Sequence, residues 1–394
     1  MSNGSLLCQP PGTGYRPDLD GLRAIAVLAV VAYHAFPEQA PGGYVGVDVF
    51  FVISGFLITN IILDALSRHG FRLREFYARR ARRILPALCL VLATCLAFGC
   101  YVLLPDEFSN LSKHTAAAAG FAANIAFWRE SGYFAPAAQF EPLLHLWSLG
   151  IEEQFYLLWP LLLLLAWRLR WHLVPTVALL GAASFALNVI MTNRQATGLY
   201  YFPFSRFWEL AVGCLLASAR VRVASARAVP AAADSPGARA STSRVPARIP
   251  GALANAVAIA GVALIAIAAF GFDAHTPFPG FAALVPIAGA SCIVAAPGSW
   301  FRERVLSHPW LVFVGLVSYP LYLWHWPILS FAAILHAGTP EIGVRVAGLA
   351  LSFVLAVLTY RLLELPIRKR RRPSVSVALA GAAAALGLAG VAIY

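Results

Sequence analysis

The segment YRPDLDGLRAIAVLAVVAYHAFPEQAPGGYVGVDVFFVISGFLIT, residues 15–59, decides the fold of this chain. It holds two apolar runs long enough to cross a bilayer, joined by a Gly-Gly turn. The first run carries Arg23 and His34, which are eleven residues apart. Eleven helical steps of about 100° return to nearly the same face. The sequence therefore predicts a membrane helix with a cation and an imidazole on one face.

Ionisable side chains at membrane depth indicate a functional site. Each costs at least about 2.5 kcal/mol in hydrocarbon and usually faces a protein interior or a water-filled cavity. The structural alternative is that Arg23 snorkels or pairs with Asp20, while His34 is a satisfied core histidine. Because both side chains fall on one face, we favour a functional site.

The composition also indicates a membrane protein. Hydrophobic residues make up 60% of the 394 residues and charged residues 12%, against roughly half and a quarter in soluble domains. The net charge of +12 does not imply a nucleic-acid partner, because most arginines flank apolar stretches, as the positive-inside rule predicts. The six cysteines lack Cys-x-x-Cys spacing, so we expect neither a disulfide framework nor a metal site.

The apolar stretches predict an all-α polytopic bundle of about eleven membrane helices. Every arginine-rich loop follows an even-numbered stretch, so the N-terminus is predicted to be cytoplasmic with those loops. The predicted spans are 19–37, 44–66, 84–104, 145–168, 172–191, 203–219, 251–271, 280–297, 310–336, 342–365 and 374–394. The arginine-rich loops are 68–83, 168–170, 220–248, 302–304 and 368–372.

The segment 112–128 fits no full span. Crossing the membrane there would put later arginines outside, so we predict a re-entrant or interfacial piece on the outer side. A full span paired with a broken helix at 143–155 is the alternative.

The remaining segments divide the chain into a tail, a membrane domain and a last helix. Residues 1–14 are predicted to be a disordered tail without the features of a cleaved signal, and 220–250 a disordered cytoplasmic loop rich in Ala, Pro, Ser and Arg. Residues 15–367 form the predicted membrane domain, and 368–394 a basic stop followed by the last helix.

The predicted orientation brings polar residues of several spans to one depth near the outer surface. A shared depth is what one cavity open to the outer face would require. His325 lies deeper, near the middle of a span that Pro327 kinks. The residues at the shared depth are His34, Asp48, His145, Glu152, Glu153, Arg206 and Glu209.

The motif HLWSLGIEEQF, residues 145–155, supplies the expected inward carboxylate. His145, Ser148, Glu152 and Tyr156 share one helical face, whereas Glu153 points about 100° away. We therefore expect Glu152 to face the cavity. The structural alternative is a hydrogen-bond network that only holds the helix.

Two interpretations are open for each of three further residues, Arg206, Glu209 and His325. Arg206 and Glu209 are three residues apart, so they either neutralise each other or bind substrate. His325, between two tryptophans, is either a cavity residue or part of the interfacial aromatic belt. Arg361 and Glu364 are predicted to form a structural ion pair.

An arginine cluster on the inner side fits phosphate binding. Arg79, Arg80, Arg82 and Arg83 contain two overlapping Arg-x-x-Arg pairs, and this spacing lets two guanidinium groups on a helix face grip one phosphate. The alternative is that they only set the membrane orientation.

Several sequence blocks together resemble one known family. They are the Arg-x10-His helix, GGYVGVDVFFVISGF, FYARRARRILPAL (76–88), LLHLWSLGIEEQFYLLWP (143–160), FPFSRFWELAVG (202–213) and SYPLYLWHWPI (318–328). Over residues 15–367 the chain resembles the membrane-bound acyltransferase-3 family, which O-acylates carbohydrates of bacterial envelopes.

This resemblance implies an enzyme of the bacterial cytoplasmic membrane that transfers an acyl group, most commonly acetyl, from acyl-CoA to a carbohydrate acceptor. In the family an Arg-x-x-Arg pair of the first cytoplasmic loop goes with activity. Relatives often carry an extracytoplasmic esterase-like domain after the last span. Because this chain ends at Tyr394, a second transfer step would need a separate extracytoplasmic transferase.

The chemistry of such a transfer suggests roles for the polar residues. His34 is expected to act as the base or transient acyl carrier, with Glu152 or Asp48 orienting its ring. Arg23 is expected to guide the donor, whose phosphates would bind at the four arginines of the inner cluster.

A proton-coupled secondary transporter is the alternative function, because buried ionisable groups are equally expected there. The absence of an internal repeat weighs against it. A structural or flippase-like component of polysaccharide assembly is a weaker third interpretation.

Overall fold

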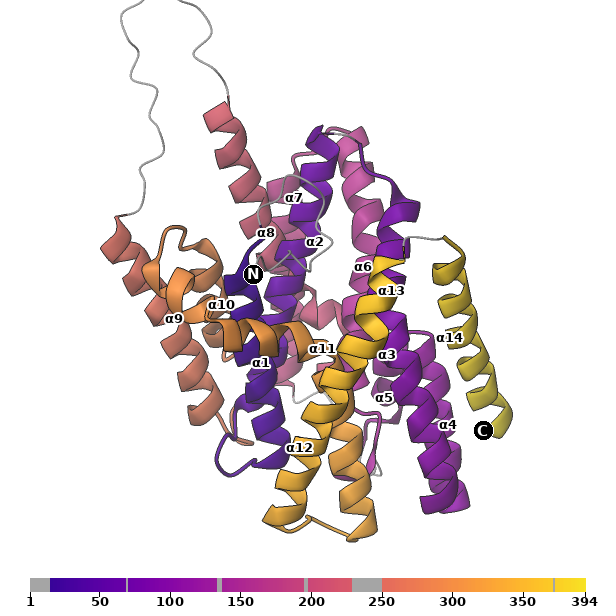
Figure 1. Cartoon of the computed structure of the whole chain (residues 1–394). Coiled ribbons are helices and arrows are strands. Elements are labelled where there is room, and N and C mark those ends of the chain that lie inside the picture. Colours follow the sequence, from indigo (N-terminus) through magenta and orange to yellow (C-terminus); the bar gives the residue numbers. More distant parts are fainter. Residues whose placement is uncertain (1–14, 69, 133–136, 195–197, 229–249, 371–372) are drawn as a thin grey trace, which may run out of the picture.

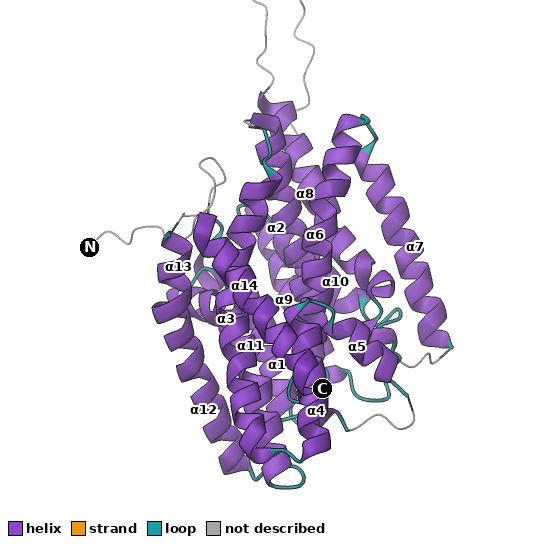
Figure 2. Ribbon diagram, turned by 90° about the vertical axis from the view of Figure 1, so that its right-hand side faces the viewer, coloured by secondary structure: helices purple, strands orange, loops and turns teal. Residues whose placement is uncertain are grey.

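The computed structural model describes residues 15–68, 70–132, 137–194, 198–228, 250–370 and 373–394. Within these ranges the regular structure is helical and contains no strand (Figures 1 and 2). The predicted disordered tail 1–14 lies outside the described residues, as do residues 229–249 of the predicted loop. Residues 220–228 of that loop are helical instead, because the eighth helix continues to Ala228.

Among the described residues, the helical elements include two π-helical segments and three 3-10 turns. Of the π-helical segments, η4 (Phe301–Leu306) precedes α11 as a separate turn, whereas η5 (Thr359–Glu364) joins α12 to α13. Short 3-10 turns are η1 (Gly43–Val45), η2 (Ala138–Phe140) and η3 (Leu199–Tyr201). The α-helices are α1 (Pro17–Ala35), α2 (Gly46–Arg68), α3 (Leu73–Val102), α4 (Pro105–Ala119), α5 (Ala123–Glu130), α6 (Leu146–Arg168), α7 (Leu173–Asn193), α8 (Pro203–Ala228), α9 (Gly251–Gly271), α10 (Leu284–Ala295), α11 (Pro309–Leu335), α12 (Ile342–Leu358), α13 (Leu365–Lys369) and α14 (Pro373–Ile393).

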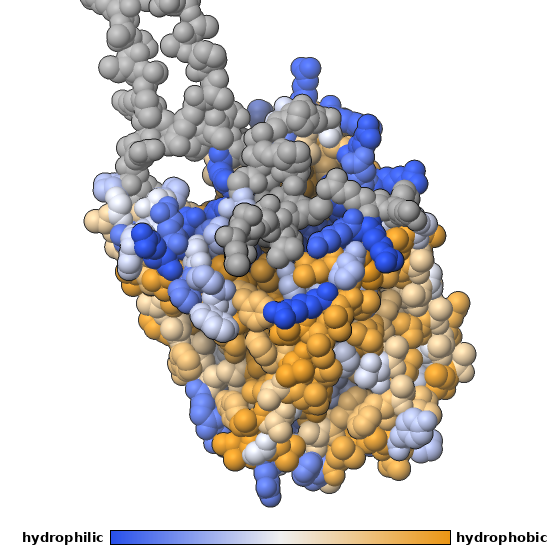
Figure 3. All heavy atoms as spheres, in the orientation of Figure 1, coloured by the Kyte–Doolittle hydropathy of each residue, from blue (hydrophilic) through white to orange (hydrophobic). Residues whose placement is uncertain are grey.

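Among the described residues, eight helices are long and apolar enough to cross a bilayer. They are α2 with η1, α3, α6, α7, α9, α11, α12 with α13, and α14. On the face shown in Figure 3, hydrophobic residues cover most of the surface and hydrophilic side chains gather at its upper end. The chain is therefore a polytopic membrane protein, as predicted.

Three predicted spans differ from the other eight. α1 and α8 have the length of a span, but each carries charged side chains, such as Asp20 and Arg206, that are buried inside the bundle. The predicted span 280–297 is wrong as a full crossing. Its helix, α10, has only 12 residues, which is about 18 Å.

Helices α4 and α5 form a hairpin that turns back at Gly120 and Phe121, where Phe121 has a φ of 55°. α4 packs against α3 and α14, and α5 packs against α6. With 15 and 8 residues, neither helix can cross a bilayer alone. This agrees with the predicted re-entrant piece. The alternative of a broken helix at 143–155 is wrong, because α6 is continuous from Leu146.

Close backbone contacts hold the bundle around the polar interior. α2 and α8 touch through Gly55 and Gly213: a Cβ on Gly55 would lie 2.0 Å from the Leu210 carbonyl oxygen, and one on Gly213 would lie 2.2 Å from that of Val52. Small residues at such crossings let membrane helices approach closely. Elsewhere, Glu364 pairs with Arg368 rather than with the exposed Arg361, so the predicted Arg361–Glu364 pair is wrong.

Candidate active site

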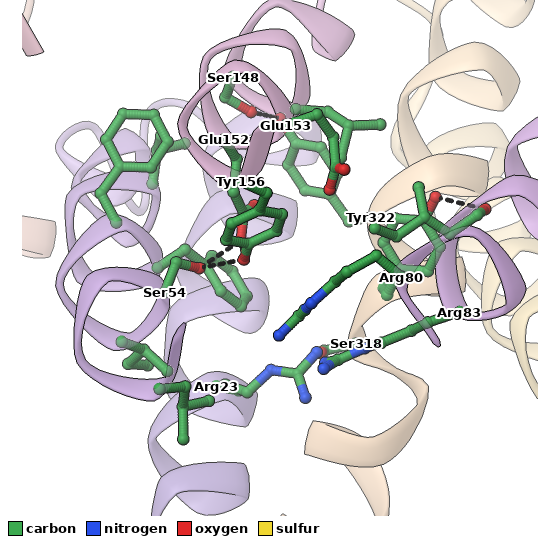
Figure 4. Close-up of a pocket in the computed structure, with 18 residues that line it drawn as sticks. Arg23, Ser54, Arg80, Arg83, Ser148, Glu152, Glu153, Tyr156, Ser318 and Tyr322 are labelled. Carbon is green, nitrogen blue, oxygen red and sulfur yellow. Dashed lines mark hydrogen bonds between the residues drawn. The ribbon is translucent and has the colours of Figure 1, made fainter. Parts of the chain in front are cut away.

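A polar cavity of ≈ 80 Å³ lies between α1, α2, α3, α6 and α11 (Figure 4). At roughly 15 Å³ per molecule, it has room for about five waters. Its polar lining residues are Arg23, Ser54, Arg80, Arg83, Ser148, Glu152, Glu153, Tyr156, Ser318, Tyr319 and Tyr322. The cavity thus joins arginines of the first and third helices to the carboxylates of α6.

The carboxylate of Glu152 faces this cavity, but the structure does not bring the predicted set together in it, since none of His34, Asp48, His145, Arg206 and Glu209 lines it. The Glu152 carboxylate accepts hydrogen bonds from Ser54 and Tyr156, and Tyr156 lies one turn along α6. Ser148 also lines the cavity, so Ser148, Glu152 and Tyr156 share the predicted face, whereas His145 precedes α6 and does not line the cavity. Glu153 was expected to point away, but it lines the cavity as well. The cavity therefore spans more of the α6 surface than a single helical stripe.

The four clustered arginines divide into two pairs with different surroundings. Arg80 and Arg83 line the cavity, and Figure 4 shows their side chains extending from α3 toward that of Arg23. Arg80 also lies over the ring of Tyr156, at 4.7 Å from its centroid. Arg82 instead donates a hydrogen bond to Ser376 on α14 (3.1 Å), and Arg79 pairs with Glu75 (3.8 Å). Of the four arginines predicted to bind phosphate, only the Arg-x-x-Arg pair Arg80 and Arg83 therefore remains available for it.

The catalytic histidine predicted on α1 meets a second histidine on α11. His34 Nδ1 lies 2.8 Å from His325 Nε2, and the two rings stack with centroids 5.1 Å apart. The extensive contact between α1 and α11 brings these residues together. His325 is therefore a buried interior residue rather than part of an interfacial belt.

The partners of His325 fix the protonation pattern of the pair. His325 Nδ1 lies 3.2 Å from the Leu321 carbonyl oxygen, which can only accept a hydrogen bond. In the neutral ring the proton is therefore on Nδ1, and Nε2 accepts from His34 Nδ1. Neutral His34 then has a bare Nε2, which is the nitrogen that a base or nucleophile uses.

His145 and Tyr322 connect the histidine pair to the cavity. The His145 ring lies 5.7 Å from that of His325, and neither of its nitrogens has a hydrogen-bond partner among the described residues. Tyr322 donates to the His145 carbonyl oxygen (2.6 Å), and its hydroxyl is 2.6 Å from Ser148 Oγ. Tyr322 lines the cavity, and its ring lies 5.5 Å from that of His325, so it contacts both the cavity and the histidine pair.

Asp48, Arg206 and Glu209 form a closed triad elsewhere in the bundle. Arg206 lies 3.1 Å from both carboxylates, and all three side chains are almost fully buried. The prediction that Asp48 or Glu152 contacts and orients His34 is wrong, because the partner of His34 is His325. Asp48 pairs with Arg206 instead. Glu152 accepts hydrogen bonds from Ser54 and Tyr156. Of the two interpretations of Arg206 and Glu209, the ion pair is present.

A second titratable cluster joins the α4–α5 hairpin to the segment before α6. His114 on α4 lies 2.7 Å from Glu130 and 3.1 Å from Glu141, and Lys113 lies 2.5 Å from Glu130. Burial alone would lower the pKa of His114, but the hydrogen bonds and charges of both carboxylates raise it above its ordinary value. The cluster thus favours a protonated histidine.

Tyr322, Ser54 and Tyr319 were not among the predicted site residues. Tyr322 stands three residues before His325, so helical spacing already placed the two near one face of α11. Tyr319 donates a hydrogen bond to the Ile84 carbonyl oxygen and so ties α11 to α3. Ser54 carried no signal of its own, because its role depends on the packing of α2 against α6.

The fold and these sites define a class: a polytopic membrane protein whose helix bundle encloses converging arginines, carboxylates and a histidine with a free nitrogen. Residues 16–361 match the model of the acyltransferase 3 family, described as an acyltransferase domain. The chain therefore belongs to this acyltransferase family.

Curated relatives of the chain include two O-acetyltransferases. Peptidoglycan O-acetyltransferase OatA of Listeria monocytogenes is 33% identical, over 90% of this chain and 56% of its own length. O-acetyltransferase OatA of Staphylococcus aureus is 30% identical, over 90% of this chain and 58% of its own length. The chain thus spans a little over half the length of these relatives. No solved structure matches it.

Proposed function

We propose that this protein transfers an acyl group, most simply acetyl, from a cytosolic acyl-CoA to a hydroxyl of a cell-envelope carbohydrate on the outer side of the bacterial cytoplasmic membrane. The observation that carries the proposal is the α1 helix. It presents Arg23 to the arginine-lined cavity and, eleven residues on, His34 with a free Nε2. The names of the two relatives supply the acetyl group and, for one of them, the peptidoglycan acceptor.

The donor would enter from the arginine-rich end. Arg80 and Arg83 begin the cavity on α3, and paired guanidinium groups suit the phosphates of coenzyme A. Arg23 would then attract the polar thioester end. The nucleotide would remain at the surface while the acyl end enters between the helices that line the cavity.

His34 would act as the general base for the acceptor. Its Nε2 takes the proton of the carbohydrate hydroxyl while the hydroxyl oxygen attacks the thioester carbonyl carbon. The resulting tetrahedral intermediate collapses with cleavage of the carbon–sulfur bond, and the leaving thiolate takes the proton back from His34. His325 keeps the ring oriented by accepting from Nδ1.

Acyl transfer by the purified chain tests this proposal. The full-length protein in lipid nanodiscs is supplied with radiolabelled acetyl-CoA and peptidoglycan fragments, and the products are identified by mass spectrometry. We expect labelled O-acetyl esters with the parent protein and none with His34→Ala, although that variant still inserts into the membrane. Normal transfer by His34→Ala would remove His34 from the mechanism, and no transfer by the parent protein would contradict the function.

A further inference from the structure

Four aromatic rings form a continuous cluster beside His34, which we call the aromatic shelf: Tyr33, Tyr44, Tyr200 and Phe278. Tyr33 packs edge-on against Tyr44 with ring centroids 5.3 Å apart, and Tyr44 packs edge-on against Phe278 at 4.8 Å. Phe278 and Tyr200 stack at 6.1 Å. The shelf therefore joins rings from four separate segments of the chain.

The Gly-Gly turn explains how Tyr44 reaches this position. A Cβ on Gly43 would lie 2.2 Å from the Ala29 carbonyl oxygen of α1, and one on Gly42 would lie 2.1 Å from that of Ala268 on α9. Only glycines let the turn lie between these two helices. The turn therefore sets Tyr44 between Tyr33 on α1 and Phe278 in the connection after α9.

The aromatic shelf lies next to His34, the proposed general base. The rings of Tyr33 and His34 lie 5.3 Å apart. Both residues belong to the last turns of α1, which is the end opposite to Arg23. In the proposed orientation this is the outer side, from which a carbohydrate acceptor would approach.

The exposure and polarity of the shelf fit a ligand that is both apolar and hydroxylated. Tyr200 is 38% exposed, Tyr33 and Tyr44 are partly exposed, and Phe278 is buried beneath them. Tyrosine offers a large rigid ring face together with a hydroxyl, so it contacts amphipathic partners at little entropic cost. A pyranose ring has that character, with apolar C–H faces and polar hydroxyls at its edge.

Arg206 of the closed triad lies below the shelf, where Asp48 and Glu209 pair with it. The guanidinium carbon of Arg206 is 5.8 Å from the centroids of Phe278 and Trp147. Arg206 is 1% exposed, yet its Nη1 has no hydrogen-bond partner among the described residues. A buried donor of this kind is normally satisfied by protein, water or ligand.

We propose that the aromatic shelf is the acceptor subsite, where a pyranose ring of the envelope glycan stacks on Tyr200 and Tyr44 and so delivers one hydroxyl to His34 Nε2. This inference rests on the proposed function and adds the place and chemistry of acceptor recognition.

A binding assay without donor tests the shelf. The full chain in nanodiscs is titrated with the N-acetylglucosamine–N-acetylmuramic acid disaccharide of peptidoglycan, and saturation-transfer NMR gives the Kd. We expect Tyr200→Ala to raise the Kd about tenfold, because removing a central aromatic contact usually costs this much or more. Tyr200→Phe keeps the ring face, so we expect its Kd to stay within about threefold of the parent value.

Trp128→Ala is the matched control, because Trp128 is an equally exposed aromatic residue (40%) that packs on Phe202 outside the shelf. We expect it to bind like the parent protein. The shelf is refuted if the parent protein does not bind the disaccharide saturably, if Tyr200→Ala binds like the parent, or if Trp128→Ala weakens binding equally. Binding that depends on Tyr200 without any acyl transfer from acetyl-CoA would instead support the shelf and refute the proposed function.

Discussion

Two groups of arginines and carboxylates in this bundle differ in how deeply they are buried and in what they leave available. In the closed triad, Arg206 is held by Asp48 and Glu209, and its cost of burial is offset within the protein. In the cavity, Arg80 and Arg83 point into open space shared with Glu152. Burial of charge therefore indicates a binding site only where the charges face a space that a ligand can enter.

The triad should respond to substitution through stability. Arg206→Ala leaves two carboxylates buried without their cation, so we expect the free energy of unfolding to fall by about 3–5 kcal/mol. Thermal unfolding in detergent measures this loss. The triple variant Asp48→Leu, Arg206→Met, Glu209→Leu removes all three charges and should regain most of the stability. If Arg206→Ala unfolds at the parent temperature, the triad is not a structural element.

The histidine pair should respond through the catalytic rate. His325→Leu removes the acceptor for His34 Nδ1, so we expect kcat to fall on the order of 100-fold, with the KM for acyl-CoA unchanged. His325→Gln offers an amide oxygen to the same proton and should recover much of the loss. The pH profile of kcat should also shift in His325→Leu. Equal losses in both variants, without a change in that profile, would mean that His325 is only a packing residue.

The cavity arginines should respond through donor binding. Arg80→Ala and Arg83→Ala each remove a charged contact to a phosphate, so we expect the KM for acyl-CoA to rise about tenfold. Arg82→Ala is the matched control from the same helix turn, because Arg82 bonds to Ser376 instead. Its KM should stay at the parent value. A larger effect from Arg82→Ala than from Arg80→Ala would overturn the division of the four arginines.

The smallest effect is expected at the cluster around His114. Its pKa is raised in the folded protein, because its carboxylate contacts outweigh burial. The stabilisation is therefore complete below the unfolded pKa of about 6.5 and is lost as the pH rises through the higher folded value. We expect roughly 1–2 kcal/mol from these hydrogen bonds. His114→Gln should remove this pH dependence of thermal unfolding, and an unchanged dependence would contradict the assignment.

Local periodicity predicted the features that lie along one helix. The shared face of Ser148, Glu152 and Tyr156 and the Arg-x-x-Arg spacing follow from the helical repeat alone. The pairing of His34 with His325 joins residues 291 positions apart, so it depends on how α1 packs against α11. The triad depends in the same way on the crossing of α2 and α8. The length of α10 was overestimated because an apolar run does not reveal where its helix begins.

The glycine contact between α2 and α8 has a consequence for how the bundle can open. Because the backbones of α2 and α8 are in direct contact at this crossing, the two helices have no room to shift, and this side of the interior is rigid. On the other side of the interior, α11 carries Pro320 and Pro327, which each remove an amide donor from the helix that holds Tyr322. α11 is held just as closely against α1, because a Cβ on Gly315 would lie 1.9 Å from the Asp20 carbonyl oxygen. The interior is therefore bounded on both sides by helix pairs whose backbones touch at a glycine.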